Sequence, residues 1–371
     1  MKNVLIVMST NVFYGAERTL LEFLKDNREH RFFIYTSNIA DDLFDAVKAE
    51  NIQIFSSSSM RVRSIRRKPV TAVLYIVYNL FVIHRMVRQY HIDVVYGNNT
   101  IDMVYVMLYR RFFNSCVGTI CHIHDIIRRS MYHKLLRRFG KYIDAFITPS
   151  HAGKQSFVND IGSPDKVHVV YNGCSVFGPH DVQRVRTKKV LLFVGLISKL
   201  KRIDLFIQIL DQLNTDYPKQ YQGMIVGSMS ENDPVYIAAV KAQLNQSDIT
   251  YFGHVKHEQL CSEIFLQADA LILTSDRDTL PTVVLEAMAS NVLVCARAVD
   301  GVPEMIQNGV NGVLWDYDAS VETMAAAVHA ALSDEGKAKE LQENALKTIK
   351  EKFNPDKKKE FVNILIDGIP I

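Results

Sequence analysis

The stretch from Ala270 to Trp315 decides the fold, and it reads ALILTSDRDTLPTVVLEAMASNVLVCARAVDGVPEMIQNGVNGVLW. An apolar run at residues 270–273 predicts a buried parallel strand, and a polar loop follows it. Residues 283–289 have helical spacing and good helix formers, and residues 292–296 form a second apolar run. Strand, loop, helix and strand in this order predict a βαβ unit. Open α/β sheets bind ligands at the carboxyl ends of such strands, where helix N-termini present unpaired N–H groups.

Glu286 is the residue of this stretch that packing explains least. It stands in the apolar sequence VVLEAMA, eight residues after Asp278. One interpretation places it on the solvated stripe of an amphipathic helix. The other directs its carboxylate along the helix, where it accepts hydrogen bonds from the hydroxyl groups of a ligand, with Asp278 as a second acid nearby. Periodicity leaves both interpretations open.

This arrangement resembles the donor-binding signature of the family-4 retaining glycosyltransferases, which have the two-domain GT-B fold. The family pattern is Glu-Gly-aromatic-Pro, four residues, and then Glu-Ala-Met. This chain has Asp278-Thr279-Leu280-Pro281 and, after four residues, Glu286-Ala287-Met288. The resemblance implies an α/β protein of two Rossmann-like parallel-sheet domains that face an interdomain cleft.

The resemblance also implies roles for the matching residues. Glu286 is expected to hold the ribose hydroxyls of a nucleoside diphosphate sugar, and Asp278 is expected to orient the donor sugar as a catalytic residue. The main-chain N–H groups near Thr282 and Val283 are expected to hold the diphosphate. Leu280 and Pro281 complete this part of the expected donor site.

The loop that opens the second half of the chain carries another part of the family signature. In the pattern Gly-Arg-x-x-x-x-Lys-Gly, two cations hold the donor diphosphate, whose developing charge needs stabilising. Lys201 matches the lysine, whereas Leu196 stands at the arginine and Arg202 at the final glycine. We expect Lys201 to act in catalysis and donor binding, with Arg202 as a substitute cation. Val255, which follows a glycine by two residues, is expected to meet the nucleotide base through its main chain.

Two positions in the first half match the family as well. Gly15 precedes a predicted helix, where a glycine allows both a tight turn and the close approach of a donor phosphate to backbone amides. His124 matches a loop histidine near the scissile bond, and we expect it to be catalytic. His122 is expected to be a core histidine on the opposite face of the strand, so a zinc pair is rejected.

Length and composition suit a globular protein of two domains. The chain has 371 residues, of which 48% are hydrophobic and 22% charged, and this is too long for one ordinary core. Five cysteines show neither a CxxC pair nor metal spacing, which indicates reduced thiols in a cytosolic protein. The apolar run at residues 4–8 is too short for a signal peptide.

Charge is distributed unevenly along the chain. Residues 1–180 contain 23 Lys and Arg against 14 Asp and Glu, whereas the remaining residues contain 20 against 26. A basic half predicts an anionic partner, and nucleic acid or an anionic membrane surface are the two candidates. We expect no nucleic acid, because no recognised module or interleaving of aromatic and basic residues supports it.

Residues 70–84, VTAVLYIVYNLFVIH, form an uncharged run after a basic segment at residues 61–68. The run is too short to span a bilayer, which takes about 20 apolar residues. We favour a buried helix of the first domain. The alternative is an interfacial membrane helix, because polybasic flanks favour anionic lipid.

We place an acceptor-binding domain at residues 1–178 and a nucleotide-sugar-binding domain at residues 179–355, joined by the polar segment 175–189. Residues 356–371 are expected to form a helix that crosses back to the first domain. A basic first domain also fits a lipid-linked or otherwise anionic acceptor.

The sequence thus predicts a retaining glycosyltransferase of the hexosyltransferase type. It is expected to move a sugar from a UDP- or GDP-sugar to a sugar or lipid-linked glycan, in bacterial surface polysaccharide or glycolipid assembly. We expect a cytoplasmic protein, peripheral on the inner face of the membrane, without a metal or another cofactor. The alternative is a sugar-nucleotide-binding protein of the same fold that lacks catalysis, which Leu196 and Thr279 favour. Epimerases and glycan phosphorylases share the fold, but we identify no pyridoxal-phosphate lysine signature for the latter.

Overall fold

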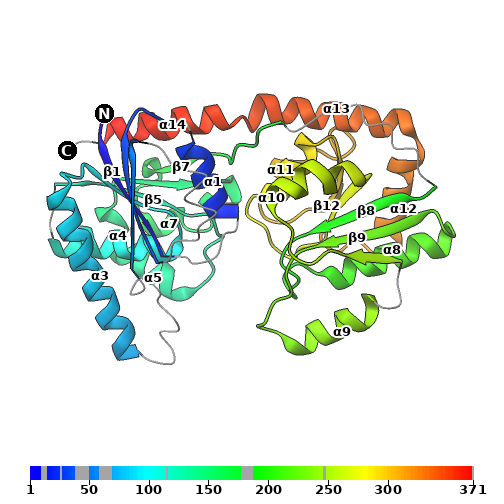
Figure 1. The fold of residues 1–371 in the computed structure, drawn as a ribbon, viewed down its shortest axis with the longest axis horizontal. Helices are drawn as coiled ribbons and strands as arrows, with labels where there is room; N and C mark the ends of the chain where they lie inside the picture. The colour runs from blue at the N-terminus through cyan, green and yellow to red at the C-terminus, as the bar shows by residue number, and fades with distance from the viewer. Residues whose placement is uncertain are drawn as a thin grey trace. The chain divides into compact units, whose positions relative to one another are not determined.

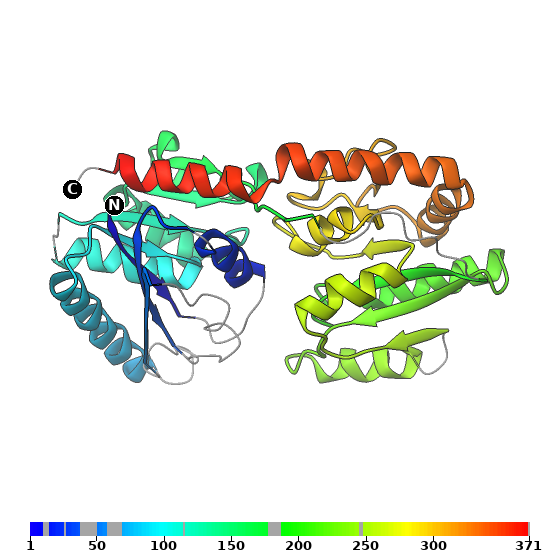
Figure 2. The same cartoon turned by 45° about the horizontal axis from the view of Figure 1, so that its top comes forward.

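The computed structural model describes residues 1–9, 15–25, 27–37, 50–57, 69–113, 116–176, 187–244 and 248–369. Contacts divide the chain into two compact units, which are Met1–Gly173 with Pro355–Ile371 (unit 1) and Cys174–Asn354 (unit 2). The predicted boundary at residue 178 and the basic segment 61–68 lie outside the described residues. Each unit is built on one sheet, with helices on its faces (Figures 1 and 2).

Unit 1 holds a seven-stranded parallel sheet in the order β3-β2-β1-β4-β5-β6-β7. Its strands are β1 (Asn3–Met8), β2 (Arg31–Thr36), β3 (Ile52–Ser56), β4 (Val94–Gly97), β5 (Gly118–His122), β6 (Ala145–Thr148) and β7 (Val167–Val169). Its helices are α1 (Gly15–Leu24), α3 (Pro69–Gln89), α4 (Thr100–Phe113), α5 (Ser130–Phe139), α6 (His151–Gln155), α7 (Val158–Ile161) and α14 (Pro355–Gly368).

Different helices cover the two faces of this sheet, because successive residues of a strand point to opposite faces. Leu5 and Val7 of β1 pack in one core with α3, α4 and α5. Val4, Ile6 and Met8, which alternate with them along β1, pack in a second core with α1 and α14. Val362 and Ile366 of α14 are buried there. Burial of each such side chain stabilises the fold by about 1.5–3 kcal/mol, so α14 is an integral part of unit 1.

Unit 2 holds a six-stranded parallel sheet in the order β10-β9-β8-β11-β12-β13. Its strands are β8 (Lys189–Val194), β9 (Tyr221–Val226), β10 (Ile249–Tyr251), β11 (Ala270–Leu273), β12 (Leu293–Arg297) and β13 (Val313–Trp315). Its helices are α8 (Ile203–Asp216), α9 (Pro234–Leu244), α10 (His257–Gln259), α11 (Thr282–Ala289), α12 (Val321–Ser333) and α13 (Glu335–Lys352). The βαβ unit predicted within Ala270–Trp315 is confirmed as β11, α11 and β12.

The helix predicted over residues 70–84 forms as part of α3, but the prediction that it is buried is wrong. Leu80, Ile83, Met86 and Val87 pack against the sheet, whereas most large side chains before Leu80 are exposed. An apolar run favours a helix without revealing how much of it the rest of the fold covers. In the described part of the chain, no helix combines the length and the apolar character that crossing a membrane requires.

Candidate functional site

Lys201 lies in the loop between β8 and α8, and contacts with the loop after β11 hold it there. The Thr274 hydroxyl donates a hydrogen bond to the carbonyl oxygen of Lys201 at 2.9 Å. The backbone N–H of Asp276 donates to the carbonyl oxygen of Leu200, also at 2.9 Å. Two neighbouring parallel strands therefore place their carboxyl-end loops in direct contact, at the edge of the sheet where ligands bind.

Lys201 and Asp278, the two residues of unit 2 predicted to be catalytic, form an ion pair. The Lys201 Nζ lies 2.5 Å from Asp278 Oδ2, and the two side chains are 25% and 15% exposed. The Asp278 N–H donates to Asp300 Oδ2 at 3.2 Å, which ties the loop to the turn after β12. The pair thus holds one cation and one carboxylate ready at the same edge of the sheet.

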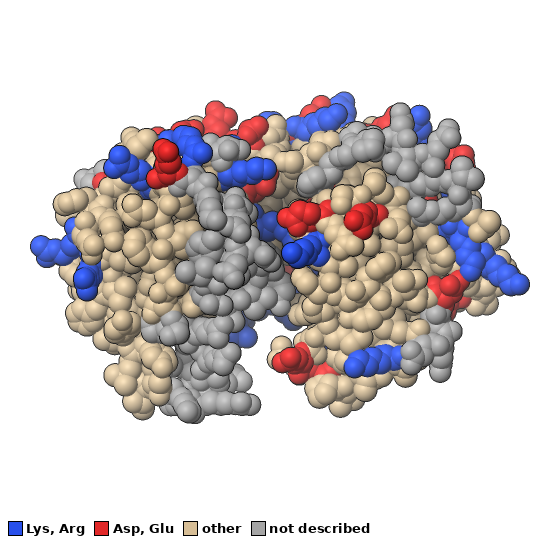
Figure 3. All heavy atoms as spheres, in the orientation of Figure 1, with Lys and Arg blue, Asp and Glu red and all other residues tan. Residues whose placement is uncertain are grey.

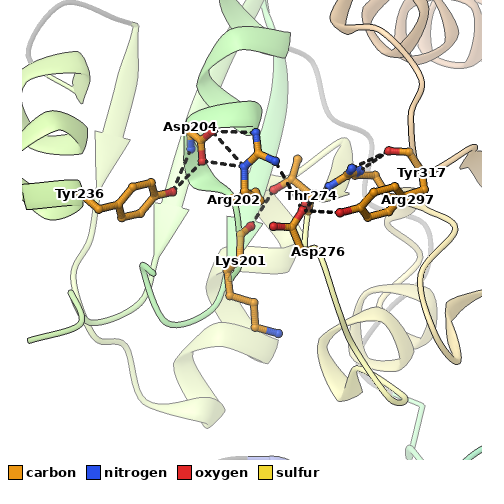
Figure 4. A network of polar contacts seen from close by, with 8 residues as sticks. All are labelled: Lys201, Arg202, Asp204, Tyr236, Thr274, Asp276, Arg297 and Tyr317. Carbon is orange, nitrogen blue, oxygen red and sulfur yellow. Dashed lines mark hydrogen bonds and ion pairs between the residues drawn. The ribbon is translucent and has the colours of Figure 1, made fainter. Parts of the chain in front are cut away.

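Arg202 faces away from this pair. It caps the N-terminus of α8 with a left-handed backbone (φ 50°), and Figure 4 shows its guanidinium and the Lys201 side chain pointing in different directions. Its Nη2 lies 3.0 Å from Asp204 Oδ2, and its Nη1 lies 3.4 Å from Asp276 Oδ1. Burial acts to raise the pKa of Asp204, but hydrogen bonds from Arg202 and Tyr236 keep that pKa below its usual value. The Arg202 guanidinium therefore forms ion pairs with the carboxylates of Asp204 and Asp276.

Arg297, at the end of β12, is a residue that no sequence pattern singled out. The residue is buried, its Nη1 donates to Asp276 Oδ1 at 2.8 Å and to the Thr274 carbonyl oxygen at 3.2 Å, and its guanidinium lies 4.2 Å from the centre of the Tyr317 ring. Its remaining nitrogens donate to the Tyr317 carbonyl oxygen. Arg297 thereby fixes the loop that carries Asp276 and, through that carboxylate, Arg202 (Figure 4).

Glu286 lies on α11 and is 4% exposed, which excludes its placement on a solvated stripe. Its Oε1 lies 3.3 Å from Nε2 of His257, a half-buried residue of the short helix α10. His257 comes from the loop region after β10, so this contact joins two segments that are remote in sequence. A buried carboxylate is costly unless it is paired or hydrogen-bonded, and His257 supplies a partner.

The other predicted donor residues gather around the N-terminus of α11 and at the end of β10. Leu280 and Pro281 are buried, and Pro281 stands at the N-cap without a side-chain hydrogen bond. Thr282 and Val283 are half-buried in the first turn, where helix N–H groups are unsatisfied from within the helix. Val255 is half-buried in the loop before α10.

Unit 1 carries its own polar set at the carboxyl edge of its sheet, and here a prediction is wrong. The rings of His122 and His124 stack with their centres 3.9 Å apart. Residues separated by two positions leave the same face of a strand, so the two rings could not have lain on opposite faces. Burial lowers the pKa of His124 to about 3, with a contribution from the charge of Lys358, so the ring is neutral near pH 7.

His122 is buried as predicted, and its Nδ1 lies 2.6 Å from the Tyr96 hydroxyl. Its Nε2, the Nε2 of His124 and both side-chain amide atoms of Asn98 are buried without a hydrogen-bond partner among the described residues. Such atoms in a native fold point to a ligand or to solvent. Gly15 is the first residue of α1, and residues 10–14 directly before it lie outside the described ranges.

Asp102 and Lys358 are two further titratable residues of unit 1 that sequence reasoning missed. Asp102 accepts a hydrogen bond from the Ser9 N–H at 2.8 Å, and burial raises its pKa to about 8. Lys358 reaches from α14 to Asn172 Oδ1 at 3.2 Å, and burial lowers its pKa to about 7. Glu29, His30 and Asp367 form a cluster of potential metal ligands in the described part of the chain, and His30 directly precedes β2, away from this edge.

Relatives by sequence include proteins named as glycosyltransferases. An uncharacterized glycosyltransferase of Methanocaldococcus jannaschii is 28% identical over 235 residues, which are 59% of this chain and 58% of that protein. A D-inositol 3-phosphate glycosyltransferase of Geodermatophilus obscurus is 32% identical over 150 residues, which are 39% of this chain and 33% of that protein. The alignments thus span well under two thirds of either relative.

Similar solved structures share the fold over the whole chain. Anabaena HepE in complex with UDP and glucose has a TM-score of 0.80 at 18% identity, with 100% of both chains covered. The lipopolysaccharide outer core galactosyltransferase WaaB has a TM-score of 0.72 at 18% identity, again with 100% of both chains covered.

Two family models match the two halves of the chain. Residues 14–176 match the model described as Glycosyltransferase Family 4, and residues 180–348 match the model described as Glycosyl transferases group 1. The two parallel-sheet units, the similar structures and these matches agree. The chain belongs to the family-4 glycosyltransferases and has the GT-B fold.

Proposed function

We propose that this protein transfers a hexosyl group from a UDP-sugar to a hydroxyl acceptor and retains the configuration of the anomeric carbon. The observation that carries the proposal is Glu286, a 4% exposed carboxylate at the carboxyl edge of the unit 2 sheet, held beside His257. A carboxylate there suits the two hydroxyls of a ribose, because charged hydrogen bonds are strong in a shielded place. Structures of Anabaena HepE with UDP and with UDP-glucose support the choice of donor.

The ion pair between Lys201 and Asp278 supports an exchange of partners on donor binding. A diphosphate carries more negative charge than a single carboxylate, so Lys201 Nζ moves from Asp278 to the diphosphate. Asp278 is then available to accept hydrogen bonds from the donor sugar. The N–H groups at the start of α11 add to the anion site, because the N-cap residue Pro281 has no side chain that could hydrogen-bond to them.

The proposed reaction breaks the bond between the anomeric carbon and the diphosphate oxygen and forms a bond from the acceptor oxygen on the same face of the sugar. The proton of the acceptor passes to the departing phosphate oxygen. Lys201 and the α11 N–H groups stabilise the charge that develops on that phosphate. No metal is part of this proposal, because groups of the chain neutralise the leaving group.

The acceptor is proposed to be a sugar or lipid-linked glycan of a bacterial surface polysaccharide or glycolipid, handled at the inner face of the membrane. The side-chain amide of Asn98 and the Nε2 atoms of His122 and His124, which have no partner among the described residues, suit hydroxyl groups, which both donate and accept. The likeness to a lipopolysaccharide galactosyltransferase supports this class of acceptor.

The test is a screen of UDP- and GDP-sugars for thermal stabilisation, followed by transfer to glycan acceptors. Ligands that bind the native state alone raise the melting temperature by mass action. We expect UDP-sugars to stabilise the protein, an α-linked product from an α-linked donor by NMR, and unchanged turnover with EDTA. A product of inverted configuration would reject the retaining mechanism.

A second candidate is a sugar-nucleotide-binding protein without catalysis. It is favoured by Leu196, which stands at the position of a family arginine. It is also favoured by the ion pairs that Arg202 forms with Asp204 and Asp276. The screen separates the two. UDP-sugar binding with neither hydrolysis nor transfer supports this second candidate.

A further inference from the structure

The first part of α3 exposes more large apolar side chains than any other helix in the described chain. Seven large apolar side chains between residues 70 and 81 are each at least 42% exposed, among them Leu74 (62%), Tyr78 (54%) and Phe81 (61%). In Figure 1 the lower, N-terminal end of α3 projects beyond the strands of unit 1. Exposed apolar surface on this scale marks an interaction site in a native protein.

Asn79 shows where the helix leaves the body of the unit. It is buried, its Oδ1 accepts a hydrogen bond from the Tyr35 hydroxyl at 2.7 Å, and its Nδ2 lies 3.4 Å from the Tyr105 hydroxyl. Leu80, Ile83 and Met86 after it pack in the core of unit 1, and the large side chains before it are mostly exposed. A polar anchor at this point fixes the apolar end of α3 in its exposed position.

The apolar surface continues onto α4. Phe113 packs edge-on against Phe81 with ring centres 5.6 Å apart and stacks on His84 at 4.5 Å. Phe112 beside it is 66% exposed. Phe113 therefore extends the apolar surface of α3 onto α4.

The exposed charges on α3, α4 and α5 are of one sign. The helices α3 and α5 contain no acidic residue, and the single acid of α4, Asp102, is buried. Exposed cations lie on all three helices: Arg85, Arg88, Arg111, Lys134 and Arg138. In Figure 3 the surface over α3 is largely uncharged, with basic side chains at its outer edge. An apolar face whose helices expose cations and no acid complements an anionic lipid surface.

We propose that the outer face formed by α3, α4 and α5 docks onto an anionic bilayer. The apolar residues of α3 and Phe112 of α4 enter the boundary between headgroups and acyl chains, while Arg85, Arg88 and Arg111 contact lipid phosphates. This surface deepens the proposed function, because it brings unit 1 to a lipid-linked acceptor. The link to a lipid-linked acceptor rests on the proposed function. The docking of the surface on lipid does not, because it requires no sugar donor.

The test is co-sedimentation of the full chain with vesicles of phosphatidylcholine alone and with added phosphatidylglycerol, at low and high salt. We expect binding to the anionic vesicles that weakens with salt. The variant L74E/Y78E/F81E is expected to lose at least about tenfold in lipid affinity, because three charges replace inserted apolar groups. The variant R85E/R88E is expected to lose the preference for anionic vesicles.

The matched control is V235E/V310E/I364E, which changes three exposed apolar residues on α9, in the loop before β13 and on α14. It is expected to bind vesicles like the wild type. Equal losses in both triple variants, or no vesicle binding by the wild type, would overturn the proposal. So would a wild-type dimer that ignores vesicles and that L74E/Y78E/F81E dissociates, since the face would then join two copies.

Thermal stabilisation by UDP, measured on the same variants, keeps the two proposals apart. Retained stabilisation shows that each variant is folded and that unit 2 is intact. Vesicle binding without any stabilisation by UDP would reject the donor proposal and leave the membrane surface standing. The reverse result would reject the surface alone.

Discussion

At the scale of single residues, Asp278 and the donor diphosphate compete for Lys201 in the proposed site. Their ion pair must open before Lys201 contacts a diphosphate. We predict that Lys201→Ala lowers UDP affinity by about tenfold or more, the cost of losing a charge-assisted contact. Asp278→Asn is predicted to bind UDP at least as tightly as the wild type, because it releases Lys201, and yet to slow sugar transfer by about a hundredfold, since the sugar loses its positioning group.

Calorimetric titration with UDP and steady-state transfer assays check both variants. The control is Lys199→Ala, because Lys199 is an exposed cation of the same loop with no proposed ligand. Weaker UDP binding in Asp278→Asn would contradict the exchange of partners.

His257 is predicted to position Glu286. Its Nε2 lies 3.3 Å from the carboxylate, so His257→Ala leaves a buried charge with one partner fewer. We expect UDP affinity to fall about tenfold. The control is His254→Ala, since His254 is exposed and lies three residues earlier. Equal UDP affinities for the wild type and His257→Ala by titration would show that this contact has no part in nucleotide binding.

Sequence patterns identified site residues that lie close together in one segment of the chain. They missed residues whose contacts join segments far apart in the sequence. Asp278 lies in the loop directly before α11 and Glu286 lies within α11, so the sequence pattern revealed their spacing. The contacts of His257 with Glu286 and of Arg297 with Asp276 join residues far apart in the chain, and spacing carries no information about them. The direction of Arg202 was equally inaccessible, because it depends on a left-handed backbone at residue 202.

At the scale of elements, the strands were the most predictable part of the fold. Central parallel strands are buried on both faces and appear as short apolar runs, and this pattern predicted β11 and β12. The same reasoning failed for α3, since a run of apolar residues has the same appearance whether or not other elements cover it. In α14, the position of Lys358 between two other lysines gave no sign that this residue is buried.

The buried Lys358 predicts how the docking of α14 depends on pH. Its pKa is about 7 in the folded protein against 10.5 for the ordinary side chain, so the unfolded chain binds more protons between these values. The free energy of unfolding therefore rises with pH across this window and is lowest, for this group, below pH 7. We predict that the wild type gains stability relative to Lys358→Met from pH 7 to pH 10.

Urea unfolding of the wild type, Lys358→Met and the exposed-site control Lys357→Met checks this prediction. Differences between variants at each pH remove the contributions of all other groups. A constant difference between the wild type and Lys358→Met across the window would show that Lys358 is not neutralised by burial.

At the scale of the whole molecule, the two units carry different chemistry. Unit 2 gathers a paired lysine, an uncapped helix start and a buried carboxylate at one edge of its sheet. Unit 1 gathers polar atoms that have no partner among the described residues at its edge, and it carries cations on the helices α3, α4 and α5. The excess of basic residues before residue 180 and of acidic residues after it follows the same division, which suits a donor unit and an acceptor unit with different partners.

The most direct test of the central claim is a calorimetric titration of the wild type and Glu286→Gln with UDP. Glutamine keeps the size of the side chain and removes its charge, so the ribose hydroxyls lose a charge-assisted acceptor. We predict that UDP binds the wild type and that Glu286→Gln binds it at least about tenfold more weakly. Equal affinity in the two proteins, or no UDP binding by a folded wild type, would contradict the account.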